Sequence, residues 1–388
     1  MWRLNGRLRE FAARVPRHCV IAVVLFVVLS GFLALLEVVP QYQVERLRKR
    51  GGQWQDHPSF LIGDCAFYRA ALISLWRDGD LDLRNNIELK QYSPSQNVSQ
   101  GARGEWYPKH SILMPIAAIP FYALARDRGL IAFNLVQLSG LLLVIWSGAR
   151  RYTTTALATG LMFCFGFGTM LRLAAYNFAP DVFSSLWVVS GVVASLYGRP
   201  LLSGVCLGLA VWAKWTNLVF VPLPVLYHAV RLEPRALLRC AVAAALPIAA
   251  ILGLNDHMFG SLFTTPYDRV LIREQGTLVL EASHRTFFTQ PFWWGLRDQL
   301  IDPQMGLLVA CPPFVLAPLG ALLLVRRSPS EALLIVSACA AQLAVFAKYD
   351  QWRESSYGPR FLMSVVALSA LLVAPAIDRL FASRRASP

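Results

Sequence analysis

The sequence has few charged residues for its length. Asp, Glu, Lys and Arg make up 15% of its 388 residues, whereas 56% are hydrophobic and the mean hydropathy is +0.47. Soluble globular domains average about 25% charged residues. The shortage of charge excludes a soluble globular chain and indicates several membrane-spanning helices, each of which needs roughly 20 mainly apolar residues.

Other missing features narrow the class further. Six of the seven cysteines lie in or beside hydrophobic segments and only Cys65 lies in an outer loop, so no disulfide can form within that loop. The chain has no Gly-rich phosphate loop and no sizeable cytosolic segment, which argues against the use of a cytosolic nucleotide. Because no repeat or low-complexity tract divides the chain, we expect residues 1–388 to form a single membrane domain.

Hydrophobic segments suited to membrane helices recur along the chain. We expect the first to be retained rather than removed as a signal, because no small-residue cleavage site follows it. Segments 201–213 and 216–230 are short and are expected to form a pair that reaches only part way, joined at Lys214. The ten predicted spans are 18–40, 130–149, 153–171, 181–197, 201–213, 216–230, 237–255, 304–325, 331–348 and 360–379.

The net charge of +14 is explained by orientation in the membrane. Basic residues of membrane proteins collect on cytoplasmic loops. With ten spans and both termini inside, the cytoplasmic side carries 16 basic and 4 acidic residues, and the outer side carries 21 and 19. The charge therefore indicates a multi-pass protein in contact with membrane lipids and no nucleic-acid partner.

Segment 112–125 is interpreted differently from the spans. Its 14 residues are too few for a usual span. As a span it would also reverse every later loop and place Arg150, Arg151 and the cluster at 231–239 outside, against the charge rule. We therefore expect a helix lying in the outer interface. This leaves a large outer loop at 41–129 and a second one at 256–303.

The large first loop contains an acid near the membrane. Connections in compact domains are usually short, so a loop of this length needs a purpose. Residues from Asp64 to Trp76 have helical spacing, with an apolar stripe formed by Phe67, Ala71 and Leu75. The pattern predicts a juxtamembrane helix lying on the membrane with Asp64 at its N-terminus. There the acid is either a helix cap, worth about 1 kcal/mol, or a functional group.

Several segments, taken together and in order, resemble the GT-C glycosyltransferases, in particular the protein-mannosyltransferase and aminoarabinose-transferase-like branch. The resemblance extends over residues 18–380 and agrees with the topology inferred from charge. Its motifs are Ile62–Tyr68 followed by Asp78–Leu83, Trp106–Leu113, Ala179–Asp181, Gly204–Asn217, Phe259–Tyr267 and Ser356–Phe361.

The resemblance implies an all-α polytopic membrane fold with ten transmembrane helices and outer-face juxtamembrane helices. It further implies an enzyme of a bacterial inner membrane that moves a hexosyl or pentosyl unit, with inversion, from polyprenyl phosphate to a hydroxyl of a lipid, glycan or protein outside the cytoplasm. Asp64 is then the general base and Asp181 a second catalytic acid. Tyr68, Lys214 and Tyr357 are candidates for binding substrate. Basic groups should surround the leaving phosphate, and the candidates are Lys109, His110, Arg172, Arg285, Arg353 and Arg360.

Alternatives stay open at several positions. Asp181, at a predicted helix start, is either an N-cap or an active-site acid. Lys214 either extends its charged group to the membrane interface from a helix end or is a functional charged residue at membrane depth. A divalent cation usually takes several oxygen ligands, and Asp64 and Asp181 supply two, so we favour metal-independent chemistry over a Mg²⁺ or Mn²⁺ site. The aromatic residues at 287–294 either line the site or, as we favour, form an interfacial belt.

Two rival functions are a transporter or flippase for a lipid-linked sugar and a GT-C-like scaffold without catalysis. Transporters hold substrate near the bilayer midplane and often consist of repeated halves. Here the interiors of the spans are almost free of charge and no halves repeat, which favours the enzyme. The scaffold is suggested by Cys65, which stands where many relatives have a second acidic or polar residue.

Overall fold

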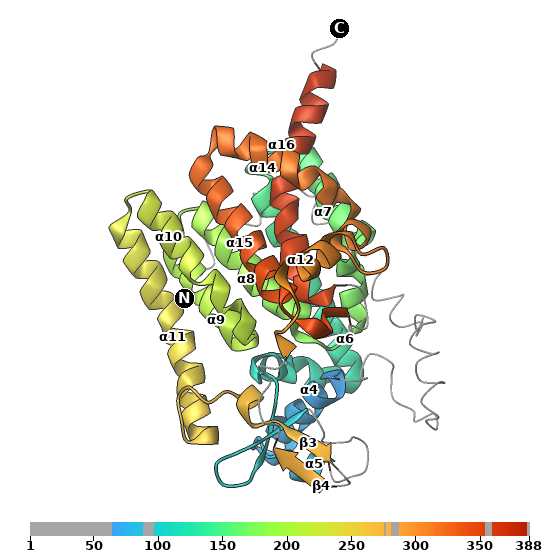
Figure 1. The fold of residues 1–388 in the computed structure, drawn as a ribbon, viewed down its shortest axis with the longest axis vertical. Helices are drawn as coiled ribbons and strands as arrows, with labels where there is room; N and C mark the ends of the chain where they lie inside the picture. The colour runs from blue at the N-terminus through green and yellow to red at the C-terminus, as the bar shows by residue number, and fades with distance from the viewer. Residues whose placement is uncertain (1–63, 88–96, 275–276, 281–286, 354–358, 386–388) are drawn as a thin grey trace.

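A computed structural model of the protein describes residues 64–87, 97–274, 277–280, 287–353 and 359–385 (Figure 1). The predicted span 18–40 and the candidate residues Arg285 and Tyr357 lie outside these ranges.

Two short antiparallel hairpins pair β1 (Val98–Gln100) with β2 (Trp106–Pro108) and β3 (Leu271–Glu274) with β4 (Thr277–Leu280). The described helices and helical turns are α4 (Asp64–Ile73), η2 (Ser74–Asp78), α5 (Arg84–Ile87), α6 (Leu113–Ala149), α7 (Thr155–Gly168), η3 (Met170–Tyr176), α8 (Pro180–Leu196), α9 (Pro200–Ala213), η4 (Trp215–Phe220), α10 (Pro222–Val230), α11 (Pro234–Phe259), η5 (Pro266–Arg269), α12 (Phe292–Ile301), α13 (Leu307–Ala310), η7 (Pro312–Leu316), α14 (Ala317–Arg327), α15 (Pro329–Ala347), η8 (Asp350–Arg353), η9 (Arg360–Leu362) and α16 (Met363–Arg385).

The apolar helices confirm the predicted all-α polytopic membrane fold. Within the described residues, four helices are long and apolar enough to cross a membrane: α6, α11, α15 and the last helix from Arg360 to Ala382. Shorter apolar helices cover 155–168, 180–196, 200–213 and 215–230. The predicted span 304–325 is divided into α13, η7 and α14, because Pro312 and Pro313 lack the amide hydrogens that a continuous helix needs.

Proline marks where many of these helices begin. α8, α9, α10, α11 and α15 each start with proline, whose missing amide hydrogen has no helical partner at that position and whose fixed φ suits a helix. Between α9 and η4, Lys214 has φ −151° and ψ 123°, an extended conformation that ends the helix. The predicted short pair joined at Lys214 is therefore present, with 14 residues in α9 against 26 in the neighbouring α11.

α16 lies at the centre of the bundle. Its residues from Val365 to Ala376 are almost completely buried, and it packs against α6, α7, α8, α14 and α15. α11 lies at the edge of the bundle (Figure 1) and exposes Leu238, Val242 and Leu246. A bundle surrounded by lipid can leave apolar side chains on its outer helices, because lipid tails are as apolar as the core.

α4, α5, the two hairpins and residues 113–124 of α6 form a layer below the bundle in Figure 1, which we call the platform. α6 bends at Arg126, whose φ is +51°. The bend is tight, since a Cβ atom at Gly129 would lie 1.9 Å from the carbonyl oxygen of Phe121. The bend separates the platform segment from the membrane helix that follows, as predicted for segment 112–125.

α4 is buried on two faces by other parts of the protein, including its predicted apolar stripe. The stripe containing Phe67 and Ala71 packs beneath both hairpins, against Val98 of β1 and Leu271 of β3. The opposite face, which contains Leu72, packs against α6. Helical periodicity predicts that a stripe will be covered by an apolar partner, but it does not say whether lipid or protein covers it.

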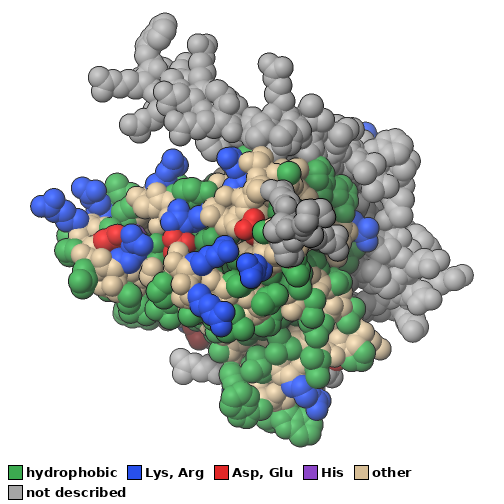
Figure 2. Space-filling model, turned by 90° about the horizontal axis from the view of Figure 1, so that it is seen from above, with side chains coloured by type: hydrophobic (Ala, Val, Ile, Leu, Met, Phe, Trp, Pro, Cys, Tyr) green, Lys and Arg blue, Asp and Glu red, His purple; other side chains and the backbone are tan. Residues whose placement is uncertain are grey.

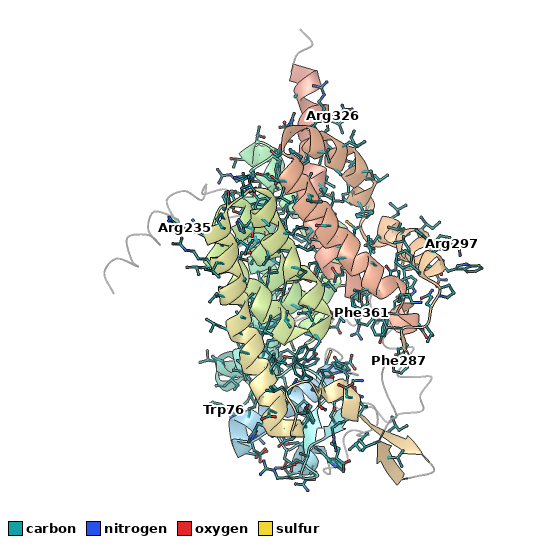
Figure 3. All side chains as sticks on the ribbon, turned by 60° about the vertical axis from the view of Figure 1, so that its left-hand side comes forward. Trp76, Arg235, Phe287, Arg297, Arg326 and Phe361 are labelled. Atoms are coloured by element: carbon teal, nitrogen blue, oxygen red, sulfur yellow. The ribbon has the colours of Figure 1, made fainter. Side chains whose placement is uncertain are left out.

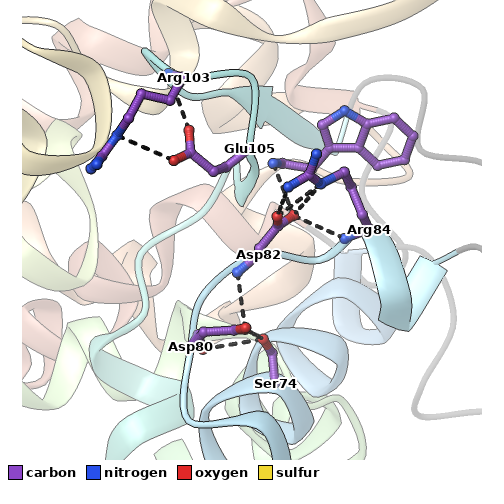
Figure 4. Close-up of polar contacts among 7 residues, drawn as sticks. Ser74, Asp80, Asp82, Arg84, Arg103 and Glu105 are labelled. Atoms are coloured by element: carbon purple, nitrogen blue, oxygen red, sulfur yellow. Dashed lines mark hydrogen bonds and ion pairs between the residues drawn. The ribbon is translucent and has the colours of Figure 1, made fainter.

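Polar side chains hold the turn that follows α4 (Figure 4). Ser74 donates a hydrogen bond to Oδ1 of Asp80 at 2.8 Å. The backbone amide of Trp106 in β2 donates to Oδ1 of Asp82 at 3.1 Å, and Arg84 forms an ion pair with the same carboxylate. These contacts join the end of α4 to the first hairpin and hold the helix in place below the bundle.

The end of the molecule opposite the platform is basic. Figure 2 views this end and shows Lys and Arg side chains gathered on it. In Figure 3, Arg235 and Arg326 lie toward this end and Trp76 lies on the platform. At the basic end, Arg151 donates to both carboxylate oxygens of Glu331 at 3.1 Å, which ties the connection after α6 to α15. The basic loops therefore lie together, away from the platform.

Candidate active site

A cavity of about 490 Å³ lies where the platform meets the bundle. Figure 3 labels Phe361 and Phe287, two of its lining residues. Seven predicted site residues also line it, although Asp64 and Arg360 are 296 positions apart in the sequence. They come from α4, the segment after β2, the start of α8, the break after α9 and η9, and they are Asp64, Tyr68, Lys109, His110, Asp181, Lys214 and Arg360.

Of the remaining candidates, one lies away from the cavity and the side chains of three fall outside the described part of the structure. Arg172 lies in η3, where the 3-10 turn leaves it exposed, and it does not line the cavity. Arg353 ends η8, and its side chain lies outside the described part of the structure. Arg285 and Tyr357 lie outside the described ranges altogether. Their predicted roles in phosphate and substrate binding stay predictions.

Asp64 is held by basic residues from two other segments. Nη2 of Arg360 donates to Oδ2 of Asp64 at 3.1 Å, and Nε2 of His110 lies 3.6 Å from Oδ1. Burial raises the pKa of Asp64, but His110, Arg360 and Lys109 outweigh burial and hold this pKa well below its usual range. The carboxylate is therefore ionised at neutral pH and faces the cavity, as a general base must.

Asp181 and Lys214 form a second pair in the cavity wall. The N-cap of α8 is Ala179, which makes no side-chain capping bond, so the capping alternative for Asp181 is wrong. Asp181 is 2% exposed and forms an ion pair with Lys214, whose side chain is 20% exposed. Nζ of Lys214 also lies 5.6 Å from the ring centroid of Phe361. Lys214 thus neutralises a buried acid instead of snorkelling outward.

An aromatic wall lines the cavity on the side of α15. Ring centroids are 5.2 Å apart between Phe288 and Tyr349 and 5.3 Å apart between Tyr349 and Phe361. Phe287 and Phe288 line the cavity, which corrects the belt that we favoured for them. Trp293 and Trp294 of α12 are 75% and 64% exposed, which fits a belt. Their position relative to the cavity separates the two groups, whereas composition did not.

Other cavity residues were missed because no spacing marked them. Tyr267 lines the cavity, and its hydroxyl lies 3.1 Å from Nδ1 of His110. The only sequence feature that pointed to Tyr267 was its place in the Phe259–Tyr267 motif. Further lining residues are Asn97, Pro180, Trp215, Thr216, Asp268, Phe346 and Gln351. Pro180 begins α8 and Phe346 lies in α15, whereas the others lie in turns and 3-10 segments, where hydrophobic periodicity carries no information.

Cys65 does not line the cavity. It is buried in an apolar cluster with Tyr68, Leu72 and Phe133. Burial raises the pKa of its thiol to about 12, so the thiol is neutral. Cys65 therefore packs as a small hydrophobic residue. Although it follows Asp64 in the sequence, its side chain is not part of the cavity lining.

The two predicted oxygen donors for a cation are each paired with a basic side chain, Asp64 with Arg360 and Asp181 with Lys214. In the part of the chain that the structure describes, no group of three or more His, Cys, Asp or Glu side chains is arranged to hold a metal ion. A divalent cation would have to displace both basic partners before using these carboxylates. Metal-independent chemistry stays our prediction.

Structures of GT-C glycosyltransferases share this fold. ArnT from Cupriavidus metallidurans, solved bound to undecaprenyl phosphate, has a TM-score of 0.59 and 12% identity over 94% of this chain and 61% of that chain. The apo oligosaccharyltransferase of Archaeoglobus fulgidus has a TM-score of 0.53 and 13% identity over 94% and 51%. The same enzyme tethered to an acceptor peptide containing the NVT sequon has a TM-score of 0.54 and 13% identity over 93% and 50%.

The likeness to these structures is one of fold. The chain spans between half and about three fifths of the length of the solved structures. No protein-family model matches the sequence, and no curated protein matches it. The chain is thus a membrane protein with the GT-C fold, as the motifs predicted, and its site has to be interpreted from its own residues.

Proposed function

We propose that the protein is an integral-membrane glycosyltransferase. It transfers a sugar from a polyprenyl-phosphate donor to a hydroxyl of a lipid, glycan or protein at the outer face of the membrane. The observation that carries the proposal is the meeting of the Asp64 carboxylate with Lys109 and Arg360 in one cavity. A carboxylate can take the proton of an attacking hydroxyl while basic groups stabilise a departing phosphate. The similar ArnT structure holds undecaprenyl phosphate, a leaving group of this kind.

In the proposed reaction, the acceptor oxygen forms a bond to the anomeric carbon while the bond from that carbon to the phosphate oxygen breaks. Attack from the side opposite the phosphate inverts the configuration. Asp64 takes the proton of the acceptor hydroxyl, and polyprenyl phosphate leaves as an anion stabilised by Lys109 and Arg360. Asp181 and Lys214 form the wall beside Phe361, and their mutual neutralisation keeps that wall free of net charge.

Arg360 links the proposed base to the proposed leaving group. It pairs with Asp64 at 3.1 Å, and a guanidinium has several donors in one plane, so it can bind a phosphate oxygen as well. The negative charge of a donor phosphate offsets the basic groups that depress the Asp64 pKa, and this pKa then rises toward its usual value. Asp64 becomes a stronger base when the donor is in place.

The proposed outer-face site requires the platform to lie outside the cytoplasm and the basic end to lie inside. Trp76 is 44% exposed on the platform and Arg235 is exposed at the basic end. In a Cys164→Ser background, we expect Trp76→Cys to react with a membrane-impermeant maleimide in intact spheroplasts. Arg235→Cys should react only after permeabilisation. The reverse pattern of labelling would contradict the proposed orientation.

The transfer reaction is tested with purified protein in nanodiscs, a panel of polyprenyl-phosphate sugars and an extract of membrane lipids and glycans as acceptors. We expect polyprenyl phosphate to be released only when donor and acceptor are both present, and release to survive thorough chelation. Loss of activity on chelation, with rescue by Mg²⁺ or Mn²⁺, would establish a metal-dependent reaction instead. Movement of the lipid-linked sugar across vesicles without release would identify a flippase, and neither activity would identify a scaffold.

A further inference from the structure

His110 lies between Asp64 and Tyr267, with each ring nitrogen directed at one of them. Nε2 is 3.6 Å from Oδ1 of Asp64, and Nδ1 is 3.1 Å from the hydroxyl oxygen of Tyr267. Tyr68 stacks on the imidazole, with ring centroids 5.2 Å apart and ring planes 19° apart. The ring is therefore held from two elements, α4 and η5, before any substrate is considered.

The partners of the two nitrogens determine where the proton of the imidazole lies. Burial raises the pKa of Tyr267, so its hydroxyl keeps its proton and can donate to Nδ1. Nε2 then carries the hydrogen and faces the Asp64 carboxylate. The opposite tautomer would set the lone pair of Nε2 against an ionised carboxylate, which is repulsive.

His110 is neutral at pH 7. Burial lowers its pKa below the ordinary value of 6.5; Asp64 raises this pKa, whereas Lys109 and Arg360 lower it. A neutral imidazole is a poorer partner for a phosphate anion than the neighbouring lysine and arginine. The titratable and charged groups that face the ring are Asp64, Tyr68, Lys109, Tyr267 and Arg360.

We propose that His110 and Tyr267 are positioning residues for Asp64, and that His110 is not a ligand of the donor phosphate as its sequence context suggested. Tyr267 sets the tautomer, the Nε2–H group of His110 orients Oδ1 of the base, and Arg360 holds Oδ2. The inference rests on the proposed function of Asp64. It corresponds to the general arrangement in which a base is oriented by a third group.

The contact between His110 and Asp64 has room to shorten. A separation of 3.6 Å is longer than a hydrogen bond, and contacts between catalytic groups commonly close only in the substrate complex. Nε2 is buried and has no hydrogen-bond partner among the described residues. A buried donor without a partner is unfavourable, so a small shift toward the carboxylate is favourable.

The arrangement is tested without turnover by nuclear magnetic resonance of the full chain labelled with ¹⁵N-histidine. The His110 signals are those that disappear in His110→Gln. We expect the wild-type protein at pH 7 to hold a neutral ring with the proton on Nε2, and Tyr267→Phe to give a mixture of tautomers. A proton on Nδ1, or a doubly protonated ring at pH 7, would overturn the proposal.

Kinetic measurements separate orientation from phosphate binding. His110→Met removes the donor at similar volume, and we expect kcat to fall about 10–100-fold, the usual cost of losing an orienting group. The donor KM and the Kd for undecaprenyl phosphate should stay within about twofold, because a positioning residue acts on the chemical step. His110→Gln restores an N–H group and should recover most of the loss. Tyr267→Phe should lower kcat with the same unchanged Kd.

The pH dependence of the transfer rate distinguishes a positioning role of His110 from a purely structural one, which would not change this dependence. Below pH 6.5 the wild-type rate should decline as His110 gains a proton, because a charged imidazole holds Asp64 more tightly and weakens the base. His110→Gln cannot titrate and should not show this decline. A decline that persists unchanged in His110→Gln would contradict the proposal.

Lys109→Met is the comparison variant for phosphate binding, and we expect it to raise the Kd for undecaprenyl phosphate about tenfold. If His110→Met raised this Kd as much, His110 would be a phosphate ligand and the proposal would be overturned. Thermal unfolding of each variant checks that it is folded. If the wild-type protein transferred no sugar from any donor, the proposed function would fail, while the tautomer measurement would still decide how His110 is held.

Discussion

Asp64→Asn is expected to lower kcat about 10²–10⁴-fold, the contribution typical of a general base. The amide keeps the size of the side chain but cannot take the proton of the acceptor hydroxyl. The loss should fall on kcat, because in the proposed site Lys109 and Arg360, not Asp64, bind the donor phosphate. The measurement is the single-turnover release of polyprenyl phosphate at saturating donor.

The matched control for this variant is Asp256→Asn. Asp256 is exposed near the end of α11 and does not line the cavity, so its amide variant should retain the wild-type rate. Thermal unfolding of Asp64→Asn checks that the loss of its ion pair with Arg360 leaves the protein folded. A folded Asp64→Asn protein that transfers sugar at the wild-type rate would remove Asp64 from the role of base.

Lys214→Met is expected to have the largest effect on stability. It removes the ion pair that Lys214 forms with the carboxylate of Asp181, which is 2% exposed. Removing one partner of a buried ion pair costs roughly 3–5 kcal/mol, because the remaining charge stays buried after losing the opposite charge that offset its desolvation. The free energy of unfolding in mixed detergent micelles, or the shift of the thermal midpoint, measures this cost.

A double-mutant cycle shows whether the cost comes from the pair. Asp181→Asn with Lys214→Met removes both charges, so the double variant should be more stable than Lys214→Met alone. Arg297→Met is the matched control, because Arg297 pairs with Asp298 at the surface with its side chain 60% exposed, and such pairs contribute less than about 1 kcal/mol. Simple additivity of the Asp181 and Lys214 variants would contradict a coupled buried pair.

The helix that carries Asp64 was predictable because its signals are local. Helical spacing predicted a helix from Asp64 to Trp76, and the structure has α4 to Ile73, continued by η2 to Asp78. The break at Lys214 and the bend near residue 126 also fall where segment lengths predicted them. Each of these features depends on residues within one or two helical turns, where period and composition act directly.

The partners inside the cavity were not predictable in the same way. Arg360 was a candidate for phosphate, and its pairing with Asp64 joins segments 296 residues apart. Tyr267 belongs to one of the motifs named above, but the motif did not predict its contact with His110. That contact forms because η5 brings the Tyr267 hydroxyl next to the imidazole. Asp181 left two interpretations open until the structure placed the N-cap of α8 at Ala179 and paired Asp181 with Lys214. Contacts of this kind depend on the relative placement of remote helices to within an ångström.

The sequence by itself determined that the chain is a bundle of membrane helices and where its basic loops lie along the chain. These follow from hydrophobic burial and charge, whose effects add up from composition and period along each segment. Only the tertiary structure decided that the hairpins cover the stripe of α4, that Phe287 and Phe288 line the cavity, and which cation holds which acid. Packing and ion pairing are short-range interactions between groups distant in sequence, so they are settled only when the helices are placed against one another.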